Sequence, residues 1–324
     1  MSNEMRPCHN LTRGKSQGSK RVLITGAGGF VGRRLTRRLV DNDRYTVFTA
    51  TRRLQSIVGS NPLEFDLRDS DSVRRVIEAA NPDIIFHLAA QSSSSGANAS
   101  PSGAWEANML GTMSLARSLQ DLAPDSTFVF ASSVEVYGLA FNDGPVDENT
   151  TPRPVSVYGK SKYAAEMMLP DLLPHTVKSI IVRPTNHSGA GQSEHFVLPS
   201  FARQVASGTS PIMTGNIKVK RDFLHVEDVV SAYERIADHV SGLPSRAVFN
   251  ISSGLTLSLD SILAKLLHVA GSDATISIDP DRIRNIDVPD AHINSDAIRR
   301  HLGWEPSVTI DELLRELFVA AQAQ

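Results

Sequence analysis

The sequence of 324 residues lacks most of the features that mark secreted, membrane-spanning or nucleic-acid-binding chains. It has a single cysteine, Cys8, so the chain cannot form an internal disulfide, and this favours a reducing cytoplasm as its compartment. The formal net charge is only −2, which gives no reason to expect nucleic acid or an anionic membrane as a partner. No apolar run reaches the roughly 18 residues that a membrane-spanning helix needs.

Two short tracts stand apart from the rest, whose 41% hydrophobic and 21% charged residues are typical of a globular protein. Residues 1–19 are polar and basic and contain no apolar stretch of a secretory signal, so we expect a disordered leader. Residues 91–100, QSSSSGANAS, are small and polar, and we expect a mobile active-site loop there. His187 and His225 have no metal-ligand spacing around them, so we expect structural roles for both and no metal site.

Residues 20–184 alternate short apolar runs with turns and amphipathic segments. The runs have the length and composition of buried strands, and they are RVLIT, YTVFTAT, LEFDL, DIIFHLAA, TFVFAS and SIIVRP. Such alternation predicts a Rossmann-type α/β fold, a doubly wound parallel sheet with helices on both faces. Ligands of such a sheet bind at the carboxyl ends of its strands, where we therefore expect the functional site.

The rhythm changes after residue 184 to frequent glycine, proline and serine with shorter apolar runs. We expect short strands at 211–214 and 217–220, and helices near 225–238, 258–270 and 309–322. No linker rich in proline or glycine separates this part from the first. Residues 185–324 are therefore predicted to form a smaller α/β portion that covers the substrate.

A glycine-rich segment, VLITGAGGFVG, places Gly26, Gly29 and Gly32 between the first predicted strand and a helix. Without side chains, these residues let the backbone turn tightly and approach a pyrophosphate, whose charge is stabilised by the amide groups of the helix N-terminus. Glycines so spaced also serve ordinary turns. The strand before them and the helix after them favour a dinucleotide site.

The end of the second predicted strand indicates which dinucleotide binds. An NAD site usually presents a carboxylate there to the ribose hydroxyls, whereas this strand ends in TATRRL and offers no acid. Arg52 and Arg53 can instead bind a 2′-phosphate, because a guanidinium donates two parallel hydrogen bonds to phosphate oxygens. The alternative is a pair of solvated surface arginines. We predict NADP.

The third predicted strand ends in FDLRD, and its Asp66 and Leu67 are candidates to border the adenine. Asp66 serves equally well as a turn residue at the end of a strand. Asp66 is therefore a candidate both for an adenine contact and for a turn at the end of the strand.

Tyr158 and Lys162 lie four residues apart in the segment SVYGKSKYAAE. On a helix this spacing puts both side chains on one face, about one turn from each other. A lysine cation beside a phenol lowers the phenol pKa, which would let Tyr158 give or take a proton at neutral pH. A tyrosine and a lysine with this spacing are more often structural, so the assignment depends on the neighbouring motifs.

Together these motifs resemble the extended short-chain dehydrogenase/reductase family, from the glycine loop through HLAAQ and Ser133 to Tyr158 and Lys162, over residues 20–322. The resemblance implies that Ser133 and Tyr158 hydrogen-bond the reacting sugar oxygen, and that Lys162 holds the nicotinamide ribose. It implies NADPH as the hydride donor. The cofactor-binding residues it implies are Gly26, Gly29, Phe30, Val31, Gly32, Arg52, Arg53, Asp66, Leu67, Leu88, Ala89, Ala90, Tyr158 and Lys162.

Within that family, three segments resemble the branch that acts on GDP-sugars: RPTNHSGAGQSEHFVLPSFARQ, GNIKVKRDFLHVEDVVSAY and DPDRIRNIDVPD. The first is most similar to reductases of GDP-4-keto-6-deoxy-mannose, and the others also to GDP-mannose 4,6-dehydratase. Thr185, Ala190 and Asn285 depart from the branch pattern and leave the shape of the sugar pocket open. The implied substrate-binding residues are Gln91, Ser133, Asn186, Val197, Arg221 and Arg284.

The segment SSVEVYG bears on whether the enzyme removes water from a sugar or reduces a ketone. Removing water from a hexose needs one group that takes a proton and another that protonates the departing hydroxyl, and related dehydratases have an Asp-Glu pair at this point. Here Val134 replaces the aspartate and only Glu135 remains. A reductase needs a single proton donor, Tyr158, so we predict that Glu135 orients a ketone for reduction. GDP-mannose dehydratases also use a glutamate without that aspartate, so a dehydratase stays an alternative.

Three alternatives therefore accompany the prediction of a GDP-4-keto-6-deoxy-hexose reductase. A dehydratase or a 4-epimerase would retain and regenerate its nicotinamide cofactor. A noncatalytic dinucleotide-sensing protein is the third, because a fold does not fix an activity. By resemblance alone we expect a homodimer in which the helix carrying Tyr158 packs against its symmetry mate.

Overall fold

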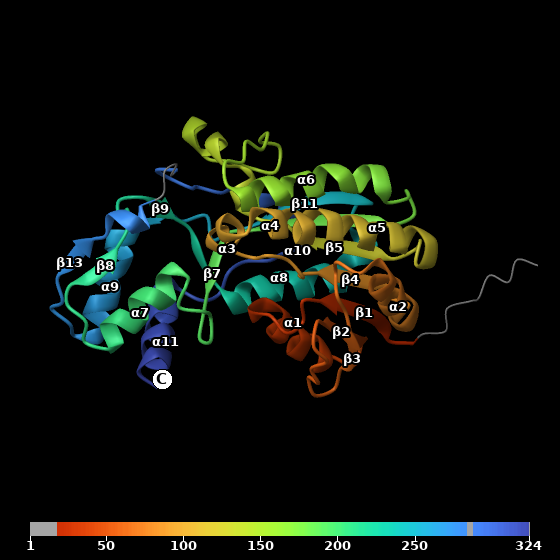
Figure 1. The fold of residues 1–324 in the computed structure, drawn as a ribbon, viewed down its shortest axis with the longest axis horizontal. Coiled ribbons are helices and arrows are strands. Elements are labelled where there is room, and N and C mark those ends of the chain that lie inside the picture. Colours follow the sequence, from red (N-terminus) through yellow and green to blue (C-terminus); the bar gives the residue numbers. More distant parts are fainter. Residues whose placement is uncertain (1–17, 284–287, 324) are drawn as a thin grey trace, which may run out of the picture.

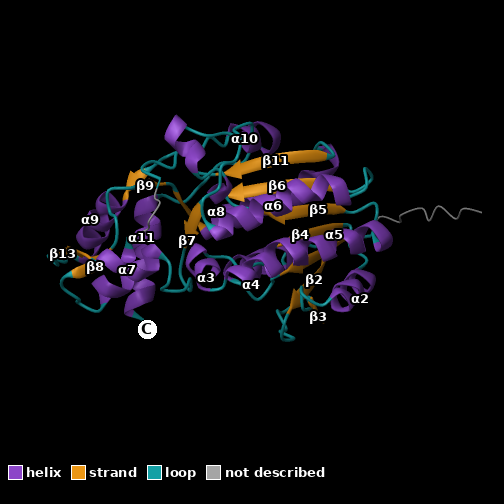
Figure 2. Ribbon diagram, turned by 45° about the horizontal axis from the view of Figure 1, so that its top comes forward, coloured by secondary structure: helices purple, strands orange, loops and turns teal. Residues whose placement is uncertain are grey.

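A computed structural model describes residues 18–283 and 288–323, and its centre is a sheet of parallel strands (Figures 1 and 2). Neighbouring strands pair in parallel throughout. In the order in which they lie across the sheet, the strands are β11 (Arg246–Ile251), β6 (Lys178–Pro184), β5 (Thr127–Ala131), β4 (Ile84–His87), β1 (Lys20–Thr25), β2 (Tyr45–Thr51) and β3 (Asn61–Glu64). The predicted doubly wound α/β fold is confirmed, and β1 to β6 lie within or overlap the six predicted runs. The predicted leader falls almost wholly on residues 1–17, outside the described residues.

The sheet also uses a strand from beyond residue 184, where we expected the dinucleotide-binding portion to end. β11 pairs with β6 in parallel, from Arg246 opposite Ser179 to Ile251 opposite Pro184. This pairing covers the backbone groups that β6 would otherwise expose at the edge of the sheet. The chain therefore returns to the first portion after building part of the second.

Helices cover both faces because successive strand residues point to opposite sides. Val22 and Ile24 of β1 lie in the core cluster under α1 (Phe30–Val40), α8 (Val226–His239) and α10 (Asp296–Leu302). Leu23, between them, lies in the cluster under α2 (Ser70–Ala80), α5 (Gly111–Leu122) and α6 (Val157–Leu172). Of the helices described in residues 18–283 and 288–323, none is long and apolar enough to cross a membrane.

A smaller lobe lies beyond the carboxyl ends of the strands, toward which the arrowheads of β5, β6 and β11 point (Figure 2). Its core joins α7 (Val197–Ala206), α9 (Leu259–Ala270) and α11 (Ile310–Gln322). Beside these helices, β8 (Ile212–Thr214) pairs with β13 (Ile276–Ile278). The three helices predicted after residue 184 and the strand at 211–214 are confirmed.

Short elements connect the lobe to the sheet. They are β7 (Asn186–Ser188) paired with β10 (Phe223–His225), and β9 (Lys220–Arg221) paired with β12 (Leu257–Ser258). The strand predicted at 217–220 is wrong, because residues 217 and 218 form a turn and only the last of the four residues begins β9. The alternation of apolar residues and lysine at 217–220 predicted a strand, but in the structure these residues form a turn that leads into β9.

The loop predicted at 91–100 is helical over most of its length. Residues Ser94–Ala99 form α3, which continues through α4 (Pro101–Trp105) and a π-helical turn (Glu106–Leu110) into α5. The Ser93 hydroxyl caps α3 by accepting a hydrogen bond from the Gly96 amide at 3.1 Å. A serine-rich tract is thus compatible with a helix start, because serine is a favoured N-cap residue.

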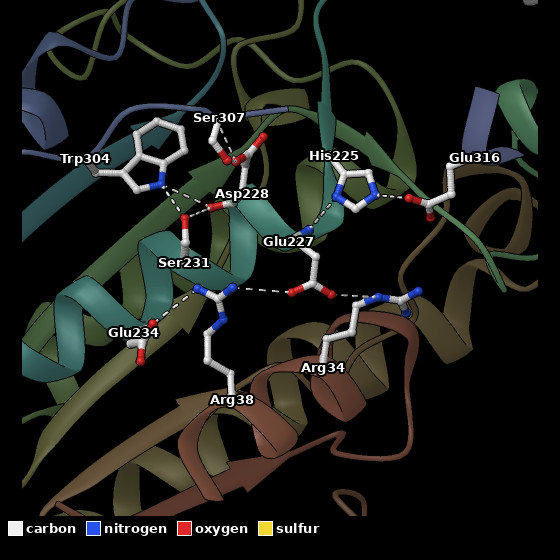
Figure 3. Close-up of polar contacts among 10 residues, drawn as sticks. All are labelled: Arg34, Arg38, His225, Glu227, Asp228, Ser231, Glu234, Trp304, Ser307 and Glu316. Carbon is white, nitrogen blue, oxygen red and sulfur yellow. Dashed lines mark hydrogen bonds and ion pairs between the residues drawn. The ribbon is translucent and has the colours of Figure 1, made fainter. Parts of the chain in front are cut away.

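Charged pairs join α1 to α8, as Figure 3 shows. Glu227 contacts Arg34 at 3.3 Å and Arg38 at 3.6 Å, and Arg38 also contacts Glu234 at 3.2 Å. These pairs fix the first helix of the sheet against the helix that leads back from the lobe.

Gly32→Ala should destabilise the protein, because an added Cβ would lie 2.3 Å from the backbone carbonyl oxygen of Gly26. We expect the free energy of unfolding to fall by about 1–3 kcal/mol, the usual cost of overpacking, with weaker dinucleotide binding. Urea denaturation measures the first effect. Gly242→Ala is the control, since a Cβ there meets no atom within 4 Å. Equal losses in the two variants would contradict the close approach at Gly32.

Candidate active site

The glycine loop between β1 and α1 is closed against the end of β4. Gly26 has φ +70°, and a Cβ on it would lie 2.7 Å from the backbone nitrogen of Ala89. Gly29 precedes the first residue of α1, and no side chain of the described residues caps this helix. The loop therefore leaves a surface of bare backbone amides at a helix N-terminus, which fits a pyrophosphate.

Two aromatic rings lie at the start of α1. The rings of Phe30 and His187 are stacked with centroids 6.4 Å apart, and Arg34 lies over Phe30 at 4.4 Å. His187 also contacts the Thr185 carbonyl oxygen through Nδ1 at 2.9 Å. The sequence predicted only a structural role for His187 and did not indicate that it lies beside the glycine loop. Val31, which follows Phe30 in α1, is half-buried.

The segment after β4 is held from both sides. The Ala89 amide donates to the Thr25 hydroxyl at 3.2 Å, and the Gln91 amide donates to the Asn108 side chain at 2.8 Å. Asn108 is buried in the π-helical turn and also donates to Ser161 of α6 at 2.9 Å. The half-buried residues Leu88, Ala89, Ala90 and Gln91 thus lie between the glycine loop and α6.

The ends of β2 and β3 carry the predicted adenosine contacts. Arg52 and Arg53 follow β2 directly and are exposed. Asp66 is half-buried, and the Arg68 guanidinium donates to its carboxylate at 3.0 and 3.2 Å. These bonds, together with a hydrogen bond from the Arg68 backbone amide, lower the pKa of Asp66. Leu67 is buried against Gly111 of α5, so its side chain belongs to the core.

Ser133 and Tyr158 meet at the carboxyl end of β5. Tyr158 lies in the first turn of α6, whose N-cap is Ser156, and the Ser133 side chain is close enough to the phenol to lower its pKa. Lys162 is 2% exposed, and its Nζ donates to the Ala131 carbonyl oxygen at 2.7 Å. The predicted set is therefore brought together, with all three side chains buried.

The expectation that Lys162 lowers the Tyr158 pKa is wrong for this structure. Burial raises the Tyr158 pKa, the nearby Glu135 carboxylate raises it further, and only the Ser133 hydrogen bond lowers it. Burial also lowers the pKa of Lys162 to about 7, against the opposing effect of Glu166. With a pKa of about 7 the lysine is only partly protonated at neutral pH, and its Nζ donates to the Ala131 carbonyl oxygen.

Glu135 is the acid nearest the reacting groups among those the sequence singled out. Its carboxylate accepts from the Ser94 hydroxyl at 2.7 and 2.6 Å and from the Ser156 hydroxyl at 2.8 Å. Val134, in contrast, is 6% exposed and packs in a cluster with Val136. The site therefore presents one fixed carboxylate, held by serines that no local pattern identified.

A buried ion pair that the sequence did not reveal supports this site. Arg183 of β6 donates to Glu166 of α6 at 3.1 and 2.5 Å, and the two side chains are 6% and 4% exposed. Ser132 also donates to Glu166, and Arg183 donates to the Tyr137 hydroxyl at 2.9 Å. The i, i+4 spacing of Glu166 from Lys162 is the one signal that could have suggested its place on the same helix face.

The predicted substrate contacts lie where the lobe meets the sheet. Asn186 of β7 is exposed and donates to the Asp222 carbonyl oxygen at 3.2 Å, and Val197 is the first residue of α7. Arg221 of β9 donates to the Val288 carbonyl oxygen at 2.7 Å. Arg284 lies outside the described residues.

Two other histidines have defined surroundings in the structure. His225 caps α8 and contacts Glu316 of α11 at 2.8 Å, so it joins the lobe to the sheet (Figure 3). His87 is buried at the end of β4, and burial lowers its pKa to about 3. In the part of the chain that is described, no cluster of three or more histidines, cysteines or acids is arranged to hold a metal ion.

A parallel sheet with a glycine loop after β1 and a Ser-Tyr-Lys set at β5 and α6 defines a nicotinamide-dinucleotide-dependent enzyme of the short-chain dehydrogenase/reductase type. Residues 22–252 match the NAD dependent epimerase/dehydratase family, and the chain belongs to it.

Its relatives include the GDP-6-deoxy-D-mannose reductase of Pseudomonas aeruginosa, 31% identical over 92% of this chain and 96% of that one. The GDP-6-deoxy-D-talose 4-dehydrogenase of Aggregatibacter actinomycetemcomitans is 29% identical over 83% of this chain and 86% of that one. Among solved structures, RMD from Pseudomonas aeruginosa complexed with NADPH is similar with a TM-score of 0.81 and 29% identity, covering 94% of this chain and 99% of that one.

Stability of the cofactor-free protein should rise with pH between about 7 and 10. Lys162 has a pKa of about 7 when folded and an ordinary value of 10.5, so in this window the unfolded chain binds one more proton. Raising the pH therefore favours the folded state, by up to about 1.4 kcal/mol per pH unit. Above pH 10 the trend reverses, because the raised pKa of Tyr158 keeps its proton only in the folded state.

Urea denaturation at several pH values tests this effect, with Lys162→Met expected to flatten the slope. Lys160→Met is the matched control, because Lys160 is exposed on the same helix. An unchanged slope in Lys162→Met would show that the buried lysine is not the group responsible.

Proposed function

We propose that this protein is an NADPH-dependent reductase of the 4-keto group of a GDP-4-keto-6-deoxy-hexose, converting GDP-4-keto-6-deoxy-D-mannose to GDP-D-rhamnose. The observation that carries this proposal is the similarity of the segment RPTNHSGAGQSEHFVLPSFARQ to the reductase branch, together with the GDP-6-deoxy-D-mannose reductase among the relatives. Val134 is packed in the core and cannot transfer a proton, whereas Glu135 is a single fixed carboxylate beside Tyr158. One proton donor with one orienting acid is sufficient for ketone reduction.

Each side chain has a definite task in this reaction. Bound NADPH supplies the hydride for the ketone carbon. Tyr158 donates its proton to the ketone oxygen, and the Ser133 hydroxyl hydrogen-bonds the developing negative charge. The raised pKa of Tyr158 keeps the phenol protonated at neutral pH, which is the state a proton donor requires. Glu135, fixed by Ser94 and Ser156, accepts from a sugar hydroxyl and orients the ring.

The choice of NADP is supported by the end of β2, where Arg52 and Arg53 stand and no acid is present. The NADPH complex of the similar Pseudomonas structure agrees with it. Bare glycine backbone at the start of α1 accommodates the pyrophosphate, with Leu88, Ala89 and Ala90 on the opposite side of the loop.

The choice of a GDP-sugar is supported by the activities named for the two relatives, both of which concern GDP-6-deoxyhexoses. In this chain we assign Asn186 to the sugar or diphosphate, Val197 to the base, Arg221 to the diphosphate, and Arg284 to phosphate or ribose. Gln91 lies beside the cofactor segment and is assigned to the sugar. We also propose a homodimer through α6, whose Met167 side chain is 61% exposed.

A 4,6-dehydratase or a 4-epimerase is the second candidate, favoured by the presence of Glu135 itself. Either enzyme would return the hydride to the sugar in each turnover, so its cofactor would stay bound and unconsumed. The 6-deoxy-D-talose epimer is the other product that reduction can give.

Mixing the pure protein with NADPH and freshly generated GDP-4-keto-6-deoxy-D-mannose tests the proposal. We expect stoichiometric loss of reduced-nicotinamide absorbance and a rhamnose product by NMR, and Tyr158→Phe should lower the rate at least about 100-fold by removing the proton donor. Persistent NADPH would overturn the reductase; formation of a 4-keto sugar from GDP-mannose would then identify a dehydratase. Full activity in Tyr158→Phe would exclude the role of the tyrosine.

Replacing Arg52 and Arg53 together with alanine should weaken NADPH binding at least about tenfold and NADH binding much less, because only NADPH carries the 2′-phosphate. Quenching or enhancement of nicotinamide fluorescence measures both dissociation constants. Arg74→Ala is a control, since Arg74 pairs with Asp121 on another part of the surface. Equal weakening of the two cofactors would remove the 2′-phosphate assignment.

A further inference from the structure

The four arginines of α1 divide into groups with different partners. Arg34 and Arg38 face α8 and are paired with Glu227 and Glu234, as Figure 3 shows. Because successive helix residues are about 100° apart, Arg33 points away from that interface. Its guanidinium therefore serves some purpose other than joining α1 to α8.

Arg33 lies instead against the glycine loop and the segment after β2. Its Nε donates to the Gly28 carbonyl oxygen at 2.8 Å, and its Nη2 is 3.5 Å from Oε1 of Gln55. No acidic side chain in the described residues forms an ion pair with it. The contacts leave a positive charge beside neutral groups only.

The same point of the structure is where the glycine loop meets the end of β2. A Cβ on Gly28 would lie 2.8 Å from Oε1 of Gln55 and 3.4 Å from Cγ2 of Thr51. Arg52 and Arg53 stand between Thr51 and Gln55 in the chain. The backbone that carries Arg52 and Arg53 therefore runs past the corner that the Arg33 guanidinium reaches from α1.

Other arginines near β2 and β3 pair with carboxylates, which makes this corner unusual. Arg44 pairs with Asp238 at 2.9 Å, and Arg68 pairs with Asp66 at 3.0 Å. Arg33, Arg52 and Arg53 form no ion pair among the residues the structure describes, although the charge of Arg52 contributes to the lowered pKa of Asp66. A cluster of like charges is held together most simply by a bound anion, and a phosphate monoester takes hydrogen bonds from several guanidinium groups at once.

We infer that Arg33 is a specificity-determining residue for the cofactor, a third cation that binds the 2′-phosphate together with Arg52 and Arg53. Gln55 is its neutral neighbour, which holds the guanidinium in place without neutralising it. This inference rests on the proposed use of NADPH. It adds a residue from α1 to the two that follow β2.

A purely structural role for Arg33 predicts a different result. If the side chain only secures the Gly28 carbonyl, its loss disturbs the glycine loop, which binds the pyrophosphate common to both cofactors. NADPH and NADH would then weaken by the same factor. Discrimination between the cofactors is therefore the informative quantity.

The test compares wild type, Arg33→Ala and Arg37→Ala by fluorescence titration with NADPH and with NADH. Arg37 is the matched control, an exposed arginine one turn further along α1. We expect Arg33→Ala to weaken NADPH about tenfold and NADH less than about twofold, with Arg37→Ala unchanged for both. Arg33→Lys should recover part of the loss, since it restores charge without the planar fork.

Competition with adenosine 2′,5′-bisphosphate and with adenosine 5′-phosphate isolates the same group, because the two differ only in the 2′-phosphate. Arg33→Ala should remove most of the preference for the bisphosphate. Equal weakening of NADPH and NADH would overturn the role of Arg33 while leaving the NADPH assignment intact. Equal affinity of the wild type for the two cofactors would overturn that assignment and this inference together, and neither result depends on whether the ketosugar is reduced.

Discussion

The buried ion pair between Glu166 and Arg183 is the interaction on which the site depends. It joins α6, which carries Tyr158 and Lys162, to β6, and through Ser132 it also reaches the end of β5, beside Ser133. Neither charge has access to water, so breaking the pair would leave an uncompensated charge in the interior, at a cost of about 3–5 kcal/mol. The relative positions of the serine and the tyrosine are thus fixed by the core and not by flexible surface contacts.

The same burial sets the chemistry of the reacting groups. It raises the Tyr158 pKa and lowers that of Lys162, so at neutral pH the phenol keeps its proton while the lysine is only partly protonated. The arginines of α1 that face α8, Arg34 and Arg38, are half-buried and pair with Glu227 and Glu234, as Figure 3 shows. Arg52 and Arg53, which follow β2, are exposed.

Much of the fold follows from local patterns, since apolar runs of strand length bounded by turns identified β1 to β6. One predicted strand and one predicted loop were wrong, and the place of β11 in the sheet was not predicted. At 91–100 and 217–220, composition suited two local structures equally, and capping by Ser93 or the start of β9 decided between them. The return of β11 to the sheet had no local signal, because strand order depends on pairing between segments far apart in the chain.

The sequence by itself determined the glycine loop and the placement of Tyr158 and Lys162 on one helix, because both depend on spacings within one turn or one helix. Only the tertiary structure decided that Asn108 holds the segment after β4, that Glu166 pairs with Arg183, and that Arg33 approaches Gln55 in the segment after β2. These contacts join different elements of the fold. Their geometry is set by sheet order and helix packing, which residue spacing along the chain does not specify.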